Sequence, residues 1–328
     1  MANVTLRQLK YFETLARELH FGRAASACAV TQPALSMQIQ ELEQQLGLAL
    51  VERTHSGVRL TEKGAEIAAR AAHVLAGVRD LVDYARYSGK PLTGRLRLGV
   101  IPSVAPYLLP RLLTLIRAEH EELELFVRET QTLPLTGELV DGKLDVLLLA
   151  LPIVHPDVTT LTVFEDKFQL ALPKGRKLSG LVRATPDLVE HERLLLLEEG
   201  HCLRDQALAY CKLRQVDSLN TFGASSLSTV VEMVAAGMGI TLLPEMCVPL
   251  ETRGREIRLM RFVDPEPSRT IGLAWRTTSP RRADFEALAA LVERAARGAK
   301  RPAREETRAG PVSVKSKGSS ARQREHGQ

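Results

Sequence analysis

The sequence has few cysteines and no long hydrophobic segment. Four cysteines in 328 residues are too few for a disulfide scaffold, and a disulfide in a reducing compartment is more often redox chemistry than a structural bond. No apolar run approaches the roughly 18 residues of a membrane span. The N-terminal segment mixes charged and apolar residues, unlike the core of a signal peptide. We therefore expect a cytoplasmic protein that does not enter a membrane.

The sequence also lacks the spacing typical of zinc ligands and of dithiol oxidoreductases. No CxxC occurs, and His191, His201, Cys202 and Cys211 do not match common zinc spacings. We therefore expect neither a metal nor an organic cofactor. A thiol peroxidase or disulfide oxidoreductase stays open as an alternative. The missing CxxC, and the lack of a peroxidase-like proline and threonine context before Cys202, argue against it.

Basic residues are concentrated at the two ends of the chain. Residues 1–98 contain 13 Lys and Arg against 9 Asp and Glu, and residues 299–328 contain 8 against 3. With a net charge of +5 overall, the middle is left at −4. This asymmetry suits a nucleic-acid-binding module at one end. Residues 299–328 have almost no large apolar side chains, so we expect a disordered basic tail.

Residues 1–60 show the pattern of a winged helix-turn-helix. Apolar residues at helical spacing predict a helix over 5–19, and a short packed helix follows it. A third helix then begins with Thr31 as N-cap and Pro33 in the first turn, and it ends at Gly47. Two short strands about a Ser56-Gly57 turn predict a wing. The inner face of the third helix carries Leu35, Ile39, Leu42 and Leu46.

The outer face of the third helix carries side chains suited to DNA. A Gln amide can bond bidentately to adenine, and Ser can bond to bases or phosphate. Arg53, at the end of the first wing strand, would meet a phosphate. The alternative is that these residues only solvate a three-helix domain, but the ordered series of helix, turn, capped helix, wing and long helix favours DNA binding. The candidate DNA-binding residues are Thr31, Gln32, Pro33, Ser36, Gln38 and Arg53.

A long helix and an α/β domain follow the wing. Residues 61–90 predict a linker helix with an apolar seam of about three heptads, which would pair two copies, and a hinge at Ser88-Gly89-Lys90-Pro91. Over 91–298 strands alternate with helices, which predicts a parallel sheet. Cys28 and Cys247 lie in apolar surroundings, and we expect both to be buried and structural.

The segment GHCLRDQALAYC places Cys202 and Cys211 nine positions apart. In a helix, nine residues rise about 13–14 Å and put the two sulfurs on opposite faces, whereas a disulfide needs Cα atoms within about 7 Å. Either the thiols never meet, or their meeting unwinds the helix. Taken alone, Cys211 is more simply a small core residue and His201 a solvated loop residue. A thiolate at Cys202 would gain from the helix start and from donors or positive charge on His201 and Arg204.

The segment FGRAASACAVTQPALSMQIQELEQQLGLALVERTHSGVRLTEKG resembles the N-terminal motif of LysR-type transcriptional regulators. Over residues 1–298 this resemblance implies a winged helix-turn-helix, a linker helix that dimerises, and a two-lobed effector domain like that of periplasmic binding proteins. The sequence departs from the family at Ser56, where the wing usually carries a basic residue. A contact of the wing with DNA at that position is therefore not expected.

Within that family, GHCLRDQALAYC, together with IPSVAPYLLP, ETQT and MVAAGMGITLLP, closely resembles the peroxide-sensing members. The resemblance implies that peroxide oxidises Cys202 to a sulfenic acid, which then forms a disulfide with Cys211. It also implies that His201, Arg204, Asp205 and Thr132 support the peroxide site. Ser103 stands where relatives carry threonine, which keeps the hydroxyl and loses a methyl group.

We therefore expect a regulator of oxidative-stress genes, not an enzyme, in which the disulfide refolds residues 200–220 and respaces the DNA-binding pairs. The expected partners are double-stranded promoter DNA, hydrogen peroxide as signal, further copies of the chain in dimers and tetramers, a thiol reductant system and RNA polymerase. The first alternative is a LysR-type regulator of a small organic ligand, with Ser103, Thr132 and a helix start near Ser225 lining an anion-accepting pocket. Cys202→Ser would separate the two, because it abolishes only the peroxide response.

Overall fold

The structure is a computed structural model that describes residues 3–54, 57–86, 90–176, 183–185, 188–189, 192–210 and 224–299. Four features predicted from the sequence lie wholly or partly outside these ranges. They are the wing residue Ser56, residues Ser88 and Gly89 of the hinge, Cys211, and the tail at 299–328 beyond its first residue.

The N-terminal domain is the predicted winged helix-turn-helix. The Thr31 side chain caps the third helix by accepting from Ala34 N at 3.4 Å, and Gly47 ends it with a φ of +69°. The two wing strands pair antiparallel. Residues from all three helices and the start of the wing form one buried core, which includes Phe12, Leu15, Leu35, Ile39, Leu42 and Leu50. The elements are α1 (Leu6–Glu18), α2 (Phe21–Ala27), α3 (Gln32–Leu46), β1 (Val51–Thr54) and β2 (Gly57–Leu60).

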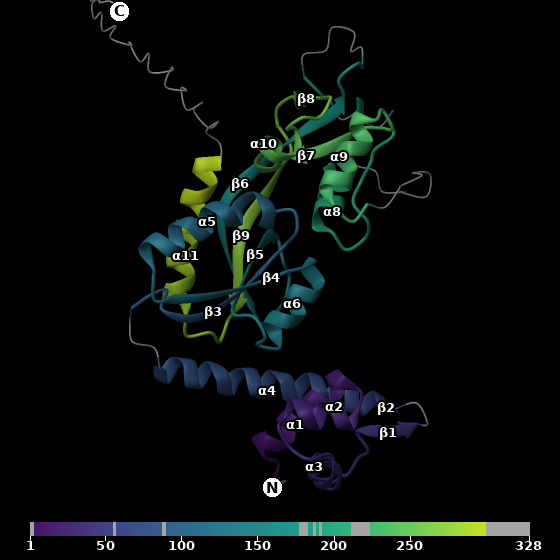
Figure 1. Ribbon diagram of the computed structural model, residues 1–328, viewed down its shortest axis with the longest axis vertical. Coiled ribbons are helices and arrows are strands. Elements are labelled where there is room, and N and C mark those ends of the chain that lie inside the picture. The colour runs from purple at the N-terminus through teal and green to yellow at the C-terminus, as the bar shows by residue number, and fades with distance from the viewer. Residues whose placement is uncertain are drawn as a thin grey trace, which may run out of the picture.

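Helix α4 (Glu62–Arg86) joins this domain to the rest of the chain. It packs against α1, and its residues Ile67 and Ala68 contact the core of the N-terminal domain. Figure 1 shows α4 lying between the small N-terminal domain and the larger domain. Its other faces leave large apolar side chains exposed, among them Leu81 at 67% and Tyr84 at 69%.

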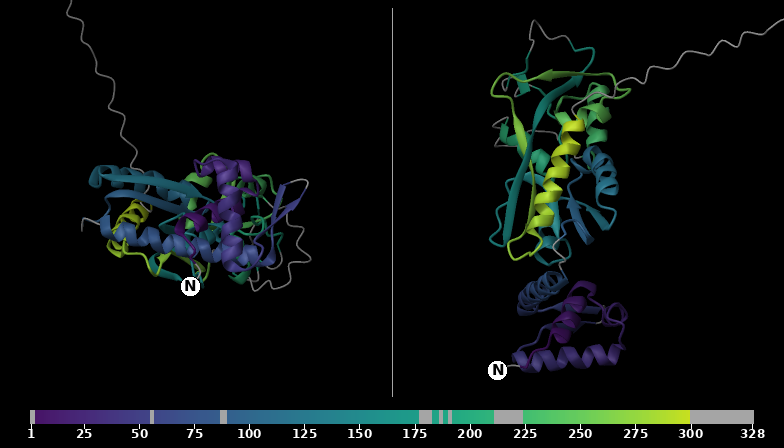
Figure 2. Two further views of the ribbon diagram at one scale, coloured as in Figure 1. Left: turned by 90° about the horizontal axis from the view of Figure 1, so that it is seen from below. Right: turned by 90° about the vertical axis from the view of Figure 1, so that its left-hand side faces the viewer.

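The larger domain has two lobes that share one long strand, β6 (Val158–Pro173). In lobe I, the first part of β6 pairs with β9, and the strand order is β4-β3-β5-β9-β6. Helix α11 covers this sheet together with α5, as the yellow helix in the right-hand view of Figure 2 shows. The other elements of lobe I are β3 (Gly94–Val100), α5 (Ala105–Glu119), β4 (Leu123–Glu129), α6 (Thr132–Val140), β5 (Val146–Leu151), β9 (Ser268–Arg276) and α11 (Arg282–Ala299).

Lobe II is built on the last part of β6, which pairs antiparallel with β7 and β8. Its helices α8 and α9 lie beside each other in Figure 1. The elements are α8 (Cys202–Tyr210), α9 (Leu227–Ala235), β7 (Thr241–Pro244), the short 3-10 helix η2 (Glu245–Cys247), α10 (Val248–Glu251) and β8 (Ile257–Arg261).

The expectation of a parallel sheet is wrong for most of the domain. Among the strand pairs of the described residues, β3–β4 and β3–β5 are parallel, whereas β9 pairs antiparallel with both β5 and β6. Strand β9 returns from the end of the chain, lies between β5 and β6, and runs opposite to both. The sheet is therefore mixed.

Cys247 is fully buried, as expected, but Cys28 is not. Cys28 is the C-cap of α2 and only partly buried, because it lies where the chain turns out of the helix. In the described part of the chain, no helix has the length and apolar character needed to cross a membrane.

Candidate peroxide pocket and DNA-binding surface

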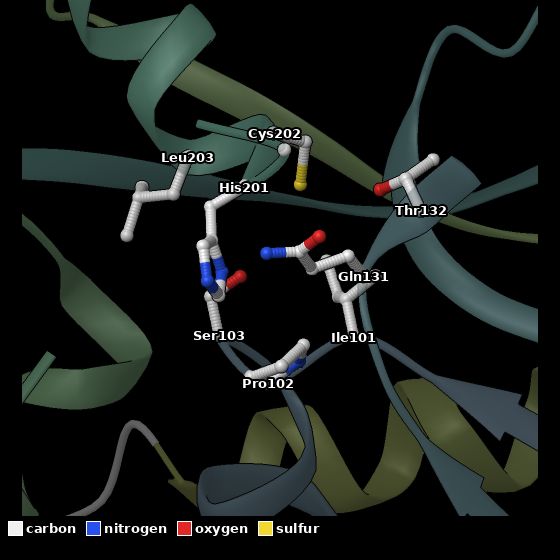
Figure 3. A pocket seen from close by; sticks show the side chains of 9 residues that line it. Ile101, Pro102, Ser103, Gln131, Thr132, His201, Cys202 and Leu203 are labelled. Atoms are coloured by element: carbon white, nitrogen blue, oxygen red, sulfur yellow. The ribbon is translucent and has the colours of Figure 1, made fainter. Parts of the chain in front are cut away.

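A small pocket lies where three chain segments from both lobes meet. Strands β3 and β4 are parallel, so the residues after their carboxyl ends lie at the same edge of the sheet. The start of α8 in lobe II closes the pocket from the other side (Figure 3). The space is about 180 Å³, including the part open to solvent. The lining residues are Ile101, Pro102, Ser103, Gln131, Thr132, Gly200, His201, Cys202 and Leu203.

Cys202 is the first residue of α8, and its sulfur points into the pocket (Figure 3). The hydroxyl of Thr132 is turned toward this sulfur. Thr132 Oγ1 is buried and has no hydrogen bond of normal geometry among the described residues, yet it lowers the pKa of the Cys202 thiol. The hydroxyl therefore gains a partner when the sulfur is ionised or when a polar molecule enters the pocket.

The pKa of Cys202 lies above its ordinary value, contrary to the expectation of a depressed one. Burial in the pocket is the largest cause, because it penalises the charged thiolate. The Thr132 hydroxyl, the positive charge of Arg269 and the backbone N–H of Leu203 act in the opposite direction. The helix start does help a thiolate, as predicted, but desolvation outweighs it.

His201 is also buried, and this lowers its pKa below the ordinary value. The imidazole is therefore neutral near pH 7 and brings no positive charge to the sulfur, which corrects that part of the expectation. It remains able to exchange a proton with a molecule in the pocket. The negative charge of Glu198 raises the His201 pKa, but less than burial lowers it.

Arg204 and Asp205 lie outside the pocket. The buried Arg204 side chain donates from Nη1 to Leu197 O at 3.2 Å and borders a separate, mostly apolar cavity beneath α8. Asp205 is exposed, and its charge raises the pKa of Cys202. Cys211 follows directly after the end of α8 and lies outside the described residues. The helix start at Ser226 caps α9 and does not line this pocket.

Arg269 is a functional candidate that the sequence analysis missed. Its side chain is fully buried on β9 and donates to the Ser103 hydroxyl at 2.9 Å and the Ser103 carbonyl at 3.0 Å. Asp166 neutralises it, with Nε to Oδ2 at 3.0 Å. Because the Ser103 oxygen accepts from Arg269, its own O–H is left to donate into the pocket. No local pattern marks a lone arginine at the start of an apolar strand as part of a site.

The predicted DNA-binding residues gather around the start of α3. Thr31, Gln32 and Pro33 are exposed there, and Ser36 and Gln38 are half-buried. Gln38 Nε2 donates to Glu41 Oε2 at 2.9 Å, so it would have to leave this partner to reach a base. Arg53 pairs with Val58 in the wing, but its side chain lies outside the described residues. Figure 1 places α3 at the end of the molecule away from the two lobes.

Comparisons with known proteins agree with the division of the chain into an N-terminal helix-turn-helix domain and a larger two-lobed domain. Residues 6–65 match the family "bacterial regulatory helix-turn-helix protein, lysR family", and residues 89–297 match the LysR substrate binding domain. A "probable hydrogen peroxide-inducible genes activator" from Streptomyces viridosporus is 46% identical over 297 residues, which cover 89% of this chain and 95% of the relative.

Solved structures of similar proteins share the fold. A full-length OxyR cysteine variant from Pseudomonas aeruginosa is 36% identical with a TM-score of 0.72, covering 88% of this chain and 97% of that one. A hydrogen peroxide-bound OxyR mutant from Corynebacterium glutamicum is 34% identical with a TM-score of 0.62, covering 90% and 95%. Over nearly its whole described length, therefore, the chain belongs to the LysR family of bacterial regulatory helix-turn-helix proteins.

Proposed function

We propose that this protein is a hydrogen peroxide-sensing transcription regulator in which Cys202 is the peroxide-reactive thiol and Cys211 the resolving thiol. The observation that carries the proposal is the pocket itself. A cysteine sulfur faces the Thr132 hydroxyl and lies within reach of an arginine charge, in a space of about 180 Å³. A thiol that faces a hydroxyl in the pocket favours an oxidant as the signal over the alternative of an organic effector.

The first step is the attack of the Cys202 thiolate on one peroxide oxygen. The O–O bond breaks, the sulfur is oxidised to a sulfenic acid, and the leaving hydroxide takes up a proton to become water. The Ser103 and Thr132 hydroxyls can hold the peroxide oxygens, and neutral His201 can exchange the proton. Arg269 stabilises the thiolate and holds Ser103 in place.

The second step joins the sulfenic sulfur to Cys211 and releases a second water. Helix α8 is regular through Tyr210, the residue before Cys211, so the helix must unwind before the two sulfurs can meet. The oxidised chain then differs in structure from the reduced chain around α8, as a switch requires. An external dithiol would reverse the bond and reset the protein.

The remaining parts of the proposal concern DNA and assembly. The start of α3 would enter the major groove with Gln32 and Ser36 near base edges, and Arg53 would meet a phosphate. Residues 61–90, through the exposed apolar side chains of α4, would pair two copies, and contacts between effector domains over 91–298 would build a tetramer. The protein would act in the cytoplasm with RNA polymerase on oxidative-stress promoters.

Peptide mapping before and after a brief dose of stoichiometric hydrogen peroxide tests the proposal. Free thiols are alkylated at each time point, and the linked peptides are identified by mass spectrometry. We expect a Cys202–Cys211 linkage to appear rapidly in the wild-type chain and to be absent in Cys202→Ser. Cys28→Ser is the matched control, because Cys28 is the C-cap of α2 in the N-terminal domain and does not line the pocket. Slow overoxidation of Cys202 without a linkage would refute the sensor.

A further inference from the structure

A buried carboxylate joins the two lobes close to the pocket. Glu251, the last residue of α10 in lobe II, is only 2% exposed. The Tyr107 hydroxyl, from α5 in lobe I, donates to Glu251 Oε1 at 2.7 Å. The Ser228 hydroxyl donates to the same oxygen at 2.9 Å, and Arg255 Nη1 donates to Oε2 at 2.6 Å. We call these four residues the Glu251 clasp.

The clasp is directly connected to the pocket wall that carries Ser103. Tyr107 follows Ser103 by four residues, and the turn between them is closed by Val104 N to Ile101 O at 3.0 Å and Tyr107 N to Val104 O at 3.2 Å. The Cys247 thiol contacts both the pocket wall and the clasp, since it lies 3.8 Å from Ser103 O and interacts with the Tyr107 hydroxyl. A shift of Tyr107 would therefore move Ser103.

The clasp and the pocket both contain residues from lobe I and from lobe II. Ser103 and Thr132 belong to lobe I, whereas Cys202 begins a helix of lobe II. A reaction between sulfur and a bound peroxide needs the reacting atoms within about 3–3.5 Å, and a misplacement of about 1 Å can cost about 100-fold in rate. Across the mouth of the pocket, Gln131 Nε2 donates to Glu199 O over a long distance of 3.4 Å.

The geometry points to Glu251 as a positioning residue for the peroxide reaction: through Tyr107 it holds the Ser103 wall of lobe I in register with Cys202 of lobe II. This inference rests on the peroxide-sensing function proposed above. Ser228 and Arg255 come from lobe II, so their bonds orient the carboxylate without crossing between lobes. Within the clasp, the bond from the Tyr107 hydroxyl to Glu251 is the one that fixes lobe I relative to lobe II.

Two rate constants at Cys202, measured on the full reduced chain, test this role. One is oxidation by hydrogen peroxide, and the other is alkylation by iodoacetamide, both followed by rapid quenching and peptide mapping. Alkylation reports the thiolate fraction and access to the sulfur but needs no bound peroxide. We expect Tyr107→Phe to slow oxidation by about 10- to 100-fold and to leave alkylation essentially unchanged.

Three further variants sharpen the test. Thr114→Val is the matched control, because it removes a hydroxyl from the same helix α5 that bonds within the helix, to Pro110 O at 2.9 Å, and it should keep the wild-type oxidation rate. Glu251→Gln keeps an acceptor for Tyr107 and should retain most of that rate, whereas Glu251→Ala should match Tyr107→Phe. Circular dichroism melting verifies that each variant is folded.

The outcomes separate the two proposals. If wild-type Cys202 does not react rapidly with peroxide, the sensing function fails. If the wild type reacts rapidly and Tyr107→Phe reacts equally fast, only the positioning role fails. A parallel fall in oxidation and alkylation would also overturn that role, because it would show general loosening of the site.

Discussion

At the scale of single residues, the reactivity of Cys202 depends on opposing contributions to its pKa. Burial holds the pKa above its ordinary value, and the Thr132 hydroxyl and the Arg269 charge lower it again. The thiolate is therefore the minor form at neutral pH, and the site depends on holding peroxide as much as on ionising sulfur. A small pocket also favours a small oxidant over larger electrophiles.

This balance predicts how the oxidation rate changes with pH and with Thr132. Because the thiol pKa is raised, the thiolate fraction increases about tenfold per pH unit below it, and we expect the rate to rise between pH 6 and 8 without a plateau. Thr132→Val removes a contribution that lowers the pKa and a donor to peroxide, so the rate should fall about tenfold or more at each pH. Quenched-flow peptide mapping across pH measures both effects.

Thr136→Val is the control for this substitution. The Thr136 hydroxyl donates to Thr132 O at 2.9 Å, one turn away on the same helix, and does not line the pocket. We expect Thr136→Val to leave the oxidation rate of Cys202 and its pH dependence close to those of the wild type. A plateau already reached at pH 7 would contradict the raised pKa.

At the scale of elements, α8 is both the support of Cys202 and the barrier to its disulfide. The helix has nine residues, and Leu203 and Ala207 help to line a small, largely apolar cavity beside it. An isolated helix this short is marginal in water. The stability of α8 therefore depends on its tertiary contacts.

Weakening α8 at an exposed position should speed disulfide formation without changing the first oxidation step. Ala209→Gly lowers helix stability by about 1 kcal/mol, which corresponds to roughly a fivefold shift toward the unwound form. We expect faster loss of the sulfenic acid to the Cys202–Cys211 disulfide, measured by trapping sulfenic acid with dimedone. Ala290→Gly, at an exposed site of α11, should have a similar helix cost and no such effect. Equal acceleration by both variants would contradict the role of α8.

At the scale of the whole molecule, a buried ion pair fixes α4 to lobe I. Arg276, at the end of β9, bonds Asp80 on α4 at 2.6 Å, and both side chains are 7% exposed. Thr278 donates to the same carboxylate at 2.9 Å. Gly142 approaches α4 so closely, with a φ of +71°, that a Cβ there would lie 2.8 Å from the Ala76 Cβ. Strand β9 thus carries one buried arginine at the peroxide pocket and another at the helix that leads to the DNA-binding domain.

Replacing Asp80 should weaken the contact between α4 and lobe I. A buried charge left without its partner costs about 3–5 kcal/mol, so Asp80→Ala should lower the melting temperature. It should also raise deuterium uptake in residues 139–144 and 76–86. Glu66→Ala, on the same helix, removes only exposed ion pairs with Lys63 and Arg70 and should change neither. Unchanged deuterium uptake in Asp80→Ala would show that the pair does not hold this contact.

The sequence by itself determined the elements whose causes are local. Thr31 and Gly47 bound the third helix, apolar residues three and four apart face its core, and the α8 segment is helical because these signals act within a few residues. The family motif also placed Ser103, Thr132, His201 and Cys202 in one site. Only the tertiary structure decided that the sheet is mixed and that Arg269, bonded to Asp166 from 103 positions away, lies beside the pocket. It also decided that burial raises the Cys202 pKa and neutralises His201, because desolvation depends on what packs around a group rather than on its neighbours in the chain.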